Sequence, residues 1–234
     1  MLYDTVYVRI KKPNIWDSLI RMWELNGDLT EKIVGADFTS NNPSYTSFVS
    51  GHMKNAVKLD PTGSGPNYLM ASLSSNVSVT NNIPKTITFW VKRAVPGIIQ
   101  WIHNGVSGAT SGQIIITDNN TLRISGAQTT PPYTETVNTF DFINDYRFVC
   151  VNTNGQFGTD LTGTNFNIYV DGILQPKINS VQPWLTGQTS FSIGGGYVQS
   201  TTASIFVEQF AVFNKQLTYD EISILFNGGN GLMY

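Results

Sequence analysis

Apolar and polar residues alternate along most of this chain, and the alternation is clearest over residues 166–170. Phe166, Ile168 and Val170 are separated by an asparagine and a tyrosine. A period of two residues predicts a β-strand with one buried face. The Asp171-Gly172 pair that follows favours the positive φ angles of a type I′ turn, so this strand is predicted to enter a hairpin.

Similar patterns recur about every ten residues, with turn-forming residues between them. Further strands are predicted over residues 1–10, 18–25, 56–60, 67–73, 86–93, 97–103, 113–117, 121–125, 146–153 and 191–194. Loops or connectors are predicted over residues 35–51, 74–84, 104–112, 126–141 and 154–163. This spacing is typical of a β-sandwich or barrel rather than of alternating strands and helices.

The longest predicted strand covers residues 205–213, where both faces are largely apolar. Such a strand is expected in the middle of a sheet with packing on each side. If the alternation is strict, one face of the strand consists of Ile205, Val207, Gln209, Ala211 and Phe213. The other face then consists of Phe206, Glu208, Phe210 and Val212.

One helix is predicted directly after this strand. Thr218 and Glu221 have the T-x-x-E spacing of a capping box at a helix start. The apolar side of the helix is formed by Ile222, Leu225 and Phe226. Gly228 is placed to end the helix.

These elements predict an all-β, two-sheet antiparallel sandwich with one short C-terminal helix. The break at Lys11-Lys12-Pro13 separates an N-terminal arm or edge strand, residues 1–15, from a sandwich over residues 16–234. The arm is expected either to cover a sheet edge or to dock on another subunit.

Composition limits the classes of partner. The 234 residues carry a net charge of −2 and only 13% charged residues, so we expect no nucleic-acid partner. No run of about 18 apolar residues occurs, so no membrane insertion is expected.

Cys150 lies in an apolar strand and is predicted to be a buried thiol. The first residues do not resemble a signal peptide, which together with the lone thiol indicates synthesis in a reducing cytosol.

Several motifs in order resemble a concanavalin A-like, laminin G-like domain. They are W-E-L-N-G (23–27), T-I-T-F-W-V-K (86–92), Y-R-F-V (146–149), N-I-Y-V-D-G (167–172), F-S-I-G-G-G (191–196) and F-A-V-F-N-K-Q-L-T-Y-D-E-I-S-I-L-F-N-G-G (210–229). The resemblance covers residues 19–232 and implies a jelly-roll of two curved antiparallel sheets. Its members include lectins, adhesion modules, glycan-cleaving enzymes and phage surface proteins, so the fold does not decide the function.

Catalytic and metal-binding patterns are sparse in the sequence. Retaining glycosidases need two carboxyl groups about 5–5.5 Å apart, but none of the five glutamates lies in an E-x-D arrangement. His52 and His103 have no acidic or cysteine neighbour. The resemblance implies a calcium-binding aspartate in the last long strand, where this chain has Glu208, and one glutamate without further oxygen ligands does not make a calcium site. We therefore expect no catalytic residue, metal or cofactor, and a hydrogen-bonded or solvent-facing Glu208.

Aromatic residues are the remaining candidates for a binding site. Trp23 and Trp90 lie in predicted strands and are expected in the core. The residues that are expected to contact a glycan are the loop residues Trp184, Tyr133, Tyr197 and Asn104. The alternative is that these aromatic residues only cap the edge of the sandwich.

Three functions remain open on the sequence. The first is a non-enzymatic structural or adhesion module, a bacteriophage virion protein (fibre, decoration or tail accessory) that contacts host-surface glycans and binds other virion subunits through residues 1–13. A virion protein is made in the cytosol and acts outside it, which explains an extracellular type of composition without a signal peptide. The alternatives are an extracellular carbohydrate-binding module and a glycoside hydrolase of the same fold.

Overall fold

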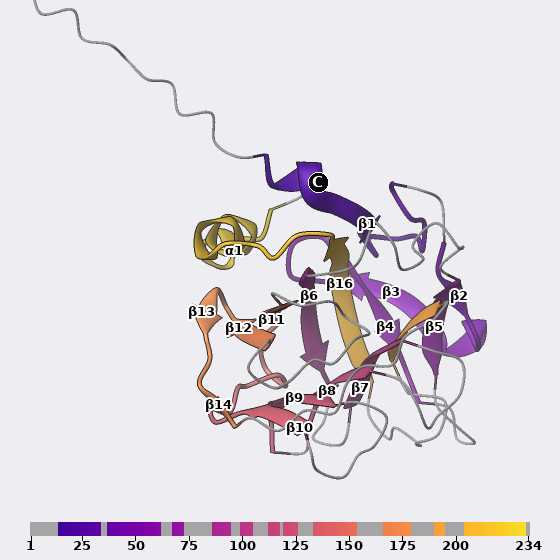
Figure 1. Ribbon diagram of the computed structural model, residues 1–234. Helices are drawn as coiled ribbons and strands as arrows, with labels where there is room; N and C mark the ends of the chain where they lie inside the picture. The colour runs from indigo at the N-terminus through magenta and orange to yellow at the C-terminus, as the bar shows by residue number, and fades with distance from the viewer. Residues whose placement is uncertain are drawn as a thin grey trace, which may run out of the picture.

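The computed structural model describes residues 14–33, 37–61, 67–72, 86–94, 99–104, 112–117, 119–125, 133–153, 166–178, 190–194 and 204–232. Their strands form two antiparallel sheets (Figure 1). Sheet A has the order β13 (Ile173–Leu174), β12 (Phe166–Val170), β11 (Arg147–Thr153), β6 (Thr86–Arg93), β16 (Ile205–Phe213), β4 (Asn55–Leu59) and β3 (Thr46–Ser50), and β1 (Leu19–Trp23) also pairs with β16. Residues 1–13 of the predicted arm lie outside the described residues.

Sheet B packs against one face of sheet A. Its order is β14 (Lys177–Ile178), β10 (Tyr133–Thr136), β9 (Leu122–Ser125), β8 (Gly112–Ile116), β7 (Ile99–Asn104), β15 (Ser190–Gly194), β5 (Tyr68–Ser72) and β2 (Thr39–Ser40). The helical elements are η1 (Ile15–Ser18), η2 (Pro43–Tyr45), α1 (Tyr219–Phe226) and η5 (Asn227–Gly229). The predicted all-β sandwich with one short C-terminal helix is confirmed.

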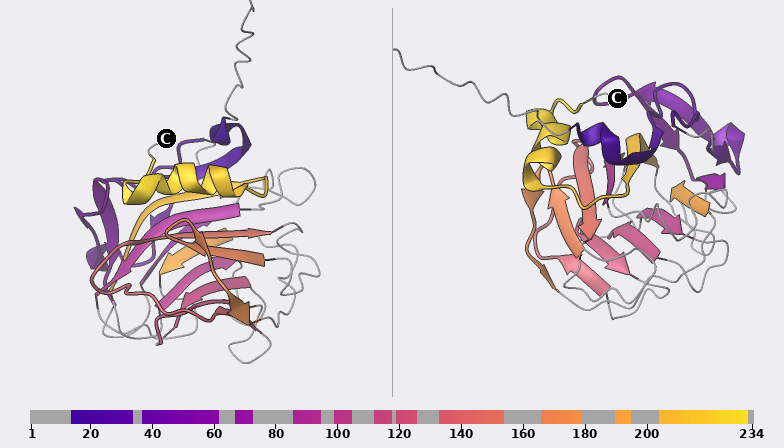
Figure 2. Two further views of the ribbon diagram at one scale, coloured as in Figure 1. Left: turned by 90° about the vertical axis from the view of Figure 1, so that its left-hand side faces the viewer. Right: turned by 45° about the horizontal axis from the view of Figure 1, so that its top comes forward.

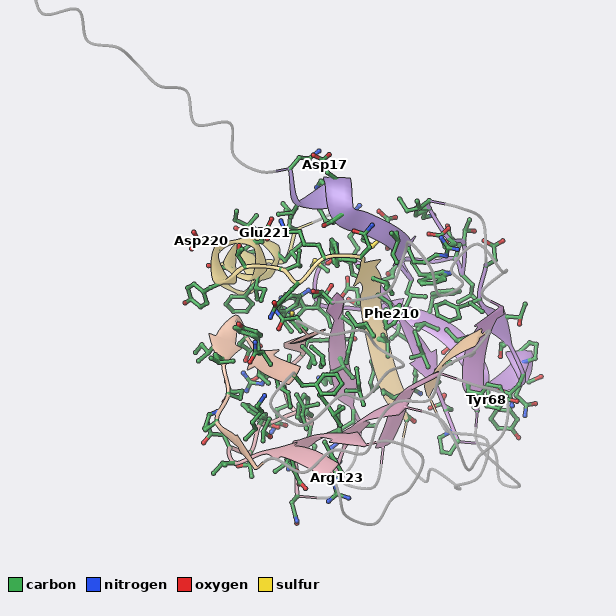
Figure 3. The ribbon with its side chains drawn as sticks, in the orientation of Figure 1. Asp17, Tyr68, Arg123, Phe210, Asp220 and Glu221 are labelled. Atoms are coloured by element: carbon green, nitrogen blue, oxygen red, sulfur yellow. The ribbon has the colours of Figure 1, made fainter. Side chains whose placement is uncertain are left out.

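Two separate apolar clusters hold these layers together. Between the sheets, Trp23 is fully buried, with its ring centroid 4.5 Å from Phe38 and 5.7 Å from Phe210. Phe210 is labelled in Figure 3. On the other face of sheet A, Trp90 packs in a second cluster that includes Leu225 of α1. Figure 2 shows α1 lying along this outer surface of sheet A, with sheet B on the far side. The predicted burial of Trp23, Trp90 and Cys150 is confirmed, and burial raises the pKa of the Cys150 thiol.

The strict alternation predicted for residues 205–213 is wrong, although the predicted central position is right. β16 pairs with β6 on one side and with β4 and β1 on the other. Its register shifts between Glu208 and Ala211, where Gln209 has a φ of 51°. This β-bulge adds one residue and exchanges the two faces. Phe210 therefore joins Val207 in the core between the sheets.

Two predicted loops contain strands that the pattern did not reveal. Residues 35–51 hold β2, η2 and β3, and residues 126–141 hold β10. β3 has exposed residues on the edge of sheet A, so its hydroxyl-rich sequence shows no burial pattern. In β10, Glu135 pairs with Arg123 at 2.9 Å and the Thr136 hydroxyl accepts the Leu122 N–H at 3.0 Å. Polar cross-strand contacts thus replace the apolar alternation.

The predicted hairpin and helix cap are present. Asp171 and Gly172 both have positive φ, 52° and 74°, as a type I′ turn requires. In α1 the Thr218 hydroxyl accepts the Glu221 N–H, and the Glu221 carboxylate accepts the Thr218 N–H at 2.9 Å. The helix ends at Phe226, where Asn227 is the C-cap in the left-handed conformation and Gly228 follows with a φ of 61°.

Replacing Glu221 by glutamine is expected to lower the free energy of unfolding by about 1 kcal/mol at neutral pH. Burial opposes ionisation, but the Lys215 ammonium and the Thr218 donors outweigh it and lower the pKa of Glu221 below its usual 4.5. A lowered pKa stabilises the fold above that value, and this contribution is lost as the pH falls through the pKa of the folded state. In urea titrations the difference between wild type and E221Q should therefore be constant well above pH 4.5 and should shrink as the pH falls below 4.5.

Asp220 provides the matched control, because it is the exposed neighbour of Glu221 in the same helical turn (Figure 3). D220N should change stability less than E221Q at pH 7. An equal loss in both variants would show that only the general charge at the helix start matters.

Candidate functional site

The four glycan contacts predicted from the sequence are only partly within the described residues. Trp184 and Tyr197 lie outside them. Tyr133 is the first residue of β10 and Asn104 is the last residue of β7, but their side chains are not described. The backbone places both in sheet B with β9 and β8 between them. These four contacts stay a prediction.

A different group of polar and aromatic residues gathers where the two sheets meet at one side of the sandwich. There β3 of sheet A lies next to β2 and β5 of sheet B, on the opposite side of the molecule from α1 (Figure 1). Figure 3 shows Tyr68 at this periphery. We name this group the tyrosine–asparagine edge, and it consists of Ser40, Asn41, Asn42, Tyr45, Thr46, Asn67 and Tyr68.

A short helical turn builds the sheet A side of this edge. Pro43 occupies the first turn of η2, where its fixed φ and missing N–H are tolerated. The Asn42 carbonyl accepts the Tyr45 N–H at 3.0 Å and the Thr46 hydroxyl at 3.2 Å. The Thr46 hydroxyl also lies 2.7 Å from the Ser40 hydroxyl, which connects β3 to β2. The chain therefore crosses from sheet B to sheet A in a fixed conformation.

Two asparagine side chains hold the tyrosine backbones, Asn41 within sheet B and Asn67 between the two sheets. The Asn41 carboxamide oxygen accepts the Tyr68 N–H at 2.7 Å, and the Asn41 N–H donates to the Tyr68 carbonyl at 3.1 Å. The Asn67 carboxamide nitrogen donates to the Tyr45 carbonyl at 2.7 Å. Because Asn67 directly precedes Tyr68, this bond fixes the backbones of the two tyrosines relative to each other.

The side chains at this edge differ in accessibility. Tyr45 is 42% exposed and Tyr68 is half-buried, whereas Asn67 is only 2% exposed. On the neighbouring strand β4 and directly after it, Lys58 and Asp60 are paired, with Lys58 Nζ 2.9 Å from an Asp60 carboxylate oxygen. The edge therefore presents aromatic rings, hydroxyl groups and amides. Such groups suit a ligand that has apolar ring faces and many hydroxyl groups.

Sequence analysis missed this edge because its segments were assigned to a loop and to an ordinary strand. One signal was available. The segments Asn41-Asn42-Pro43-Ser44-Tyr45 and Asn67-Tyr68 each place asparagine close to tyrosine next to a turn. The pairing of the two segments depends on the sheet order, which no local pattern contains.

Glu208, considered above as a calcium ligand, accepts three backbone hydrogen bonds. The N–H groups of His52 and Lys54 lie 2.8 Å from its carboxylate oxygens, and that of Met53 lies 3.1 Å away. The side chain is 2% exposed, so the solvent-facing alternative is wrong and the hydrogen-bonded one is right. Donors of this kind compensate the carboxylate charge in place of a cation. In the described ranges, no three His, Cys, Asp or Glu residues lie together as a metal site would require.

Three other glutamates also serve structural roles. The Glu31 carboxylate accepts the N–H groups of Met22 and Ile33 at 2.9 and 3.0 Å. Glu135 forms the ion pair with Arg123, and Glu221 caps α1. A general acid must instead direct its carboxyl group toward a substrate.

Comparison with known families and structures agrees with the observed fold. A family model of the Concanavalin A-like lectin/glucanases superfamily matches residues 63–223, more than half of the chain. No curated protein matches the sequence. Of the helices in the described ranges, none has the length and apolarity needed to cross a membrane.

Among the solved structures, binding domains of botulinum neurotoxins and of a mosquitocidal protein are similar. The binding domain of Paraclostridial Mosquitocidal Protein 1 is 15% identical with a TM-score of 0.66, and the match covers 92% of this chain and 53% of that one. The binding domain of botulinum neurotoxin DC, in complex with SialylT, is 19% identical with a TM-score of 0.66, covering 90% and 51%. A botulinum neurotoxin type C structure is 20% identical with a TM-score of 0.63, covering 92% and 52%. The chain thus spans about half the length of these structures, and the likeness shows a shared jelly-roll fold.

Proposed function

The chain belongs to the concanavalin A-like lectin/glucanase superfamily, and from this premise we propose that it is a non-enzymatic adhesion module that binds glycans. The observation that carries the proposal is the tyrosine–asparagine edge. Two tyrosines with accessible surface are held there by buried or backbone-bound amides, with no unpaired charge from Lys58 or Asp60 beside them. Preorganised aromatic rings beside polar groups lower the entropic cost of binding a sugar.

The structural neighbours support a binding role. Cell entry of botulinum neurotoxin type C depends on interaction with two ganglioside molecules, and the binding domain of botulinum neurotoxin DC has been described in complex with SialylT and with rat synaptotagmin II. These ligands belong to those proteins. They support the proposal because the shared fold, which makes up about half of each of these structures, occurs there in proteins that bind gangliosides, SialylT or a protein receptor.

The same superfamily also contains glucanases, so the hydrolase alternative needs its own argument. Glu31, Glu135, Glu208 and Glu221 each accept hydrogen bonds or pair with a cation within the fold. A retaining hydrolase needs two carboxyl groups that face a substrate about 5–5.5 Å apart. The use of these glutamates in the fold favours binding over hydrolysis.

A glycan array probed with the full chain tests the proposal. We expect selective binding to a subset of glycans that free sugar of the same type displaces. Hydrolysis of a bound polysaccharide, detected as new reducing ends, would instead establish the enzymatic alternative. Absence of binding to the array and to host-cell surfaces would refute the adhesion role.

The setting of this module is proposed to be a bacteriophage virion, as a fibre, decoration or tail accessory protein. The support is the single cysteine, which excludes a disulfide within the chain, combined with a low charge content of 13%. Residues 1–13 are proposed to bind a neighbouring virion subunit. Mass spectrometry of purified particles should detect the protein, and crosslinks from Lys11 and Lys12 should reach another virion protein. If this protein is absent from purified particles, the alternative of a free extracellular carbohydrate-binding module would be favoured.

A further inference from the structure

Among the described residues, no strand pairs with the outer edge of β3 in sheet A. β3 is the last strand in the sheet order, and Ser47, Phe48 and Ser50 are exposed, with Phe48 at 38%. Its sequence, T-S-F-V-S, contains no lysine, proline or acidic residue, and its register with β4 has no bulge. Proteins commonly use such residues or a bulge to prevent an edge strand from pairing with another chain, and β3 has none of these features.

The hydrogen-bond phase of β3 shows which backbone groups face outward. The Gly51 N–H donates to Lys54, and the Tyr45 carbonyl accepts the Asp60 N–H, both at 2.9 Å. Bonded positions alternate along an antiparallel ladder, so residues 45, 47, 49 and 51 face β4. The groups of Thr46, Phe48 and Ser50 then face outward. The Thr46 N–H bonds to the Pro43 carbonyl, whereas no other described strand pairs with the outward groups of Phe48 and Ser50.

We propose that β3 pairs antiparallel with β3 of a second copy of this chain, about a two-fold axis at Phe48. In this register Phe48 lies opposite Phe48 of the other copy, and the two exchange N–H···O bonds. Thr46 lies opposite Ser50, so the outward Thr46 carbonyl meets the Ser50 N–H in both halves. The pairing repeats the same contacts on both copies, as a two-fold interface requires.

Charge and side chains favour a second copy over an unrelated extended peptide. All five residues of β3 are uncharged, so self-pairing places no like charges opposite each other. The half-exposed Phe48 rings meet at the axis, where aromatic cross-strand pairs are stabilising. The strand is therefore complementary to itself.

This dimer would place two tyrosine–asparagine edges beside one interface, since Tyr45 and Thr46 lie at the start of β3. If these edges bind glycans as proposed, the dimer is bivalent, and surface-bound glycans are held more tightly than soluble ones. The pairing itself does not depend on glycan binding, so the two proposals fail independently.

Analytical ultracentrifugation of the full chain tests the pairing. Wild type should form a concentration-dependent dimer. F48K and F48E should each raise the dimer dissociation constant about tenfold or more, because like charges then lie opposite each other and the aromatic pair is lost. An equimolar mixture of F48K and F48E should associate again. V137K is the control, since Val137 is 58% exposed and lies outside β3.

Amide hydrogen exchange of the peptide that contains β3 gives a second readout. Exchange at Phe48 and Ser50 should slow as wild-type concentration rises and should be independent of concentration in F48K. A wild type that stays monomeric at all accessible concentrations would overturn the proposal. So would a dimer that F48K and F48E leave intact while both variants keep wild-type circular dichroism.

Discussion

Replacing Tyr45 or Tyr68 by alanine is expected to weaken glycan binding about tenfold, which corresponds to roughly 1.4 kcal/mol. Each change removes one ring of the tyrosine–asparagine edge. The Asn67 and Asn41 bonds that brace this edge are made to the tyrosine backbones, so they are retained. Affinity should therefore fall while the fold persists. Isothermal titration calorimetry with a glycan identified on the array measures the effect.

Tyr219 provides the matched control for these variants. It is the same residue type and is 60% exposed, but it lies on α1, on the other side of the molecule from β5. Y219A should bind as wild type does. Equal losses in Y45A, Y68A and Y219A would mean that the ligand is not held at this edge, and an unchanged affinity in both Y45A and Y68A would move the site elsewhere.

Replacing Glu208 by glutamine is expected to lower the free energy of unfolding by about 3 kcal/mol. The carboxylate offers both oxygens to the N–H groups of residues 52–54, at distances of 2.8 to 3.2 Å. A carboxamide offers one oxygen and turns its NH₂ group toward the remaining donors. Because Glu208 is 2% exposed, water does not replace the lost bonds.

Loss of the hydrogen bonds to Glu208 is expected to affect more of the structure than residues 52–54. This segment also carries His52, whose ring stacks on Trp90 with centroids 4.4 Å apart and whose Nε2 bonds to the Gly229 carbonyl. Loss of the turn should therefore loosen the contact between sheet A and the C-terminal helical segment. Guanidinium titration followed by tryptophan fluorescence measures it, with E24Q as the control at a partly exposed glutamate. A loss in E208Q no larger than in E24Q would contradict the structural role.

Local patterns predicted the elements whose stability is local. The Asp171-Gly172 turn and the Thr218–Glu221 capping box require only a few neighbouring residues, and both are present. The strand around Trp90 was equally clear, because Ile87, Phe89 and Val91 alternate along it. The general fold therefore followed from periodicity together with these signals.

Elements that depend on distant partners were not predictable in this way. The bulge at Gln209 is compatible with β16 only because β4 and β1 pair with its two halves. β10 and β3 lack an apolar alternation and are strands because a neighbour supplies their hydrogen bonds. The tyrosine–asparagine edge joins residues from positions 40–46 and 67–68, so its composition becomes visible only once the sheets are in place.

The central position of β16 has a consequence for how the molecule folds. β16 bonds to β6 and β4 and also to β1, which lies nearly two hundred residues earlier in the sequence. Closing loops of this length before any contact stabilises them makes folding slow. Before β16 pairs with them, the edges of β1, β4 and β6 lack the strand that joins them in the folded sheet. The folding intermediate should therefore be prone to aggregation, and chaperones that shield strand edges should raise its yield on refolding.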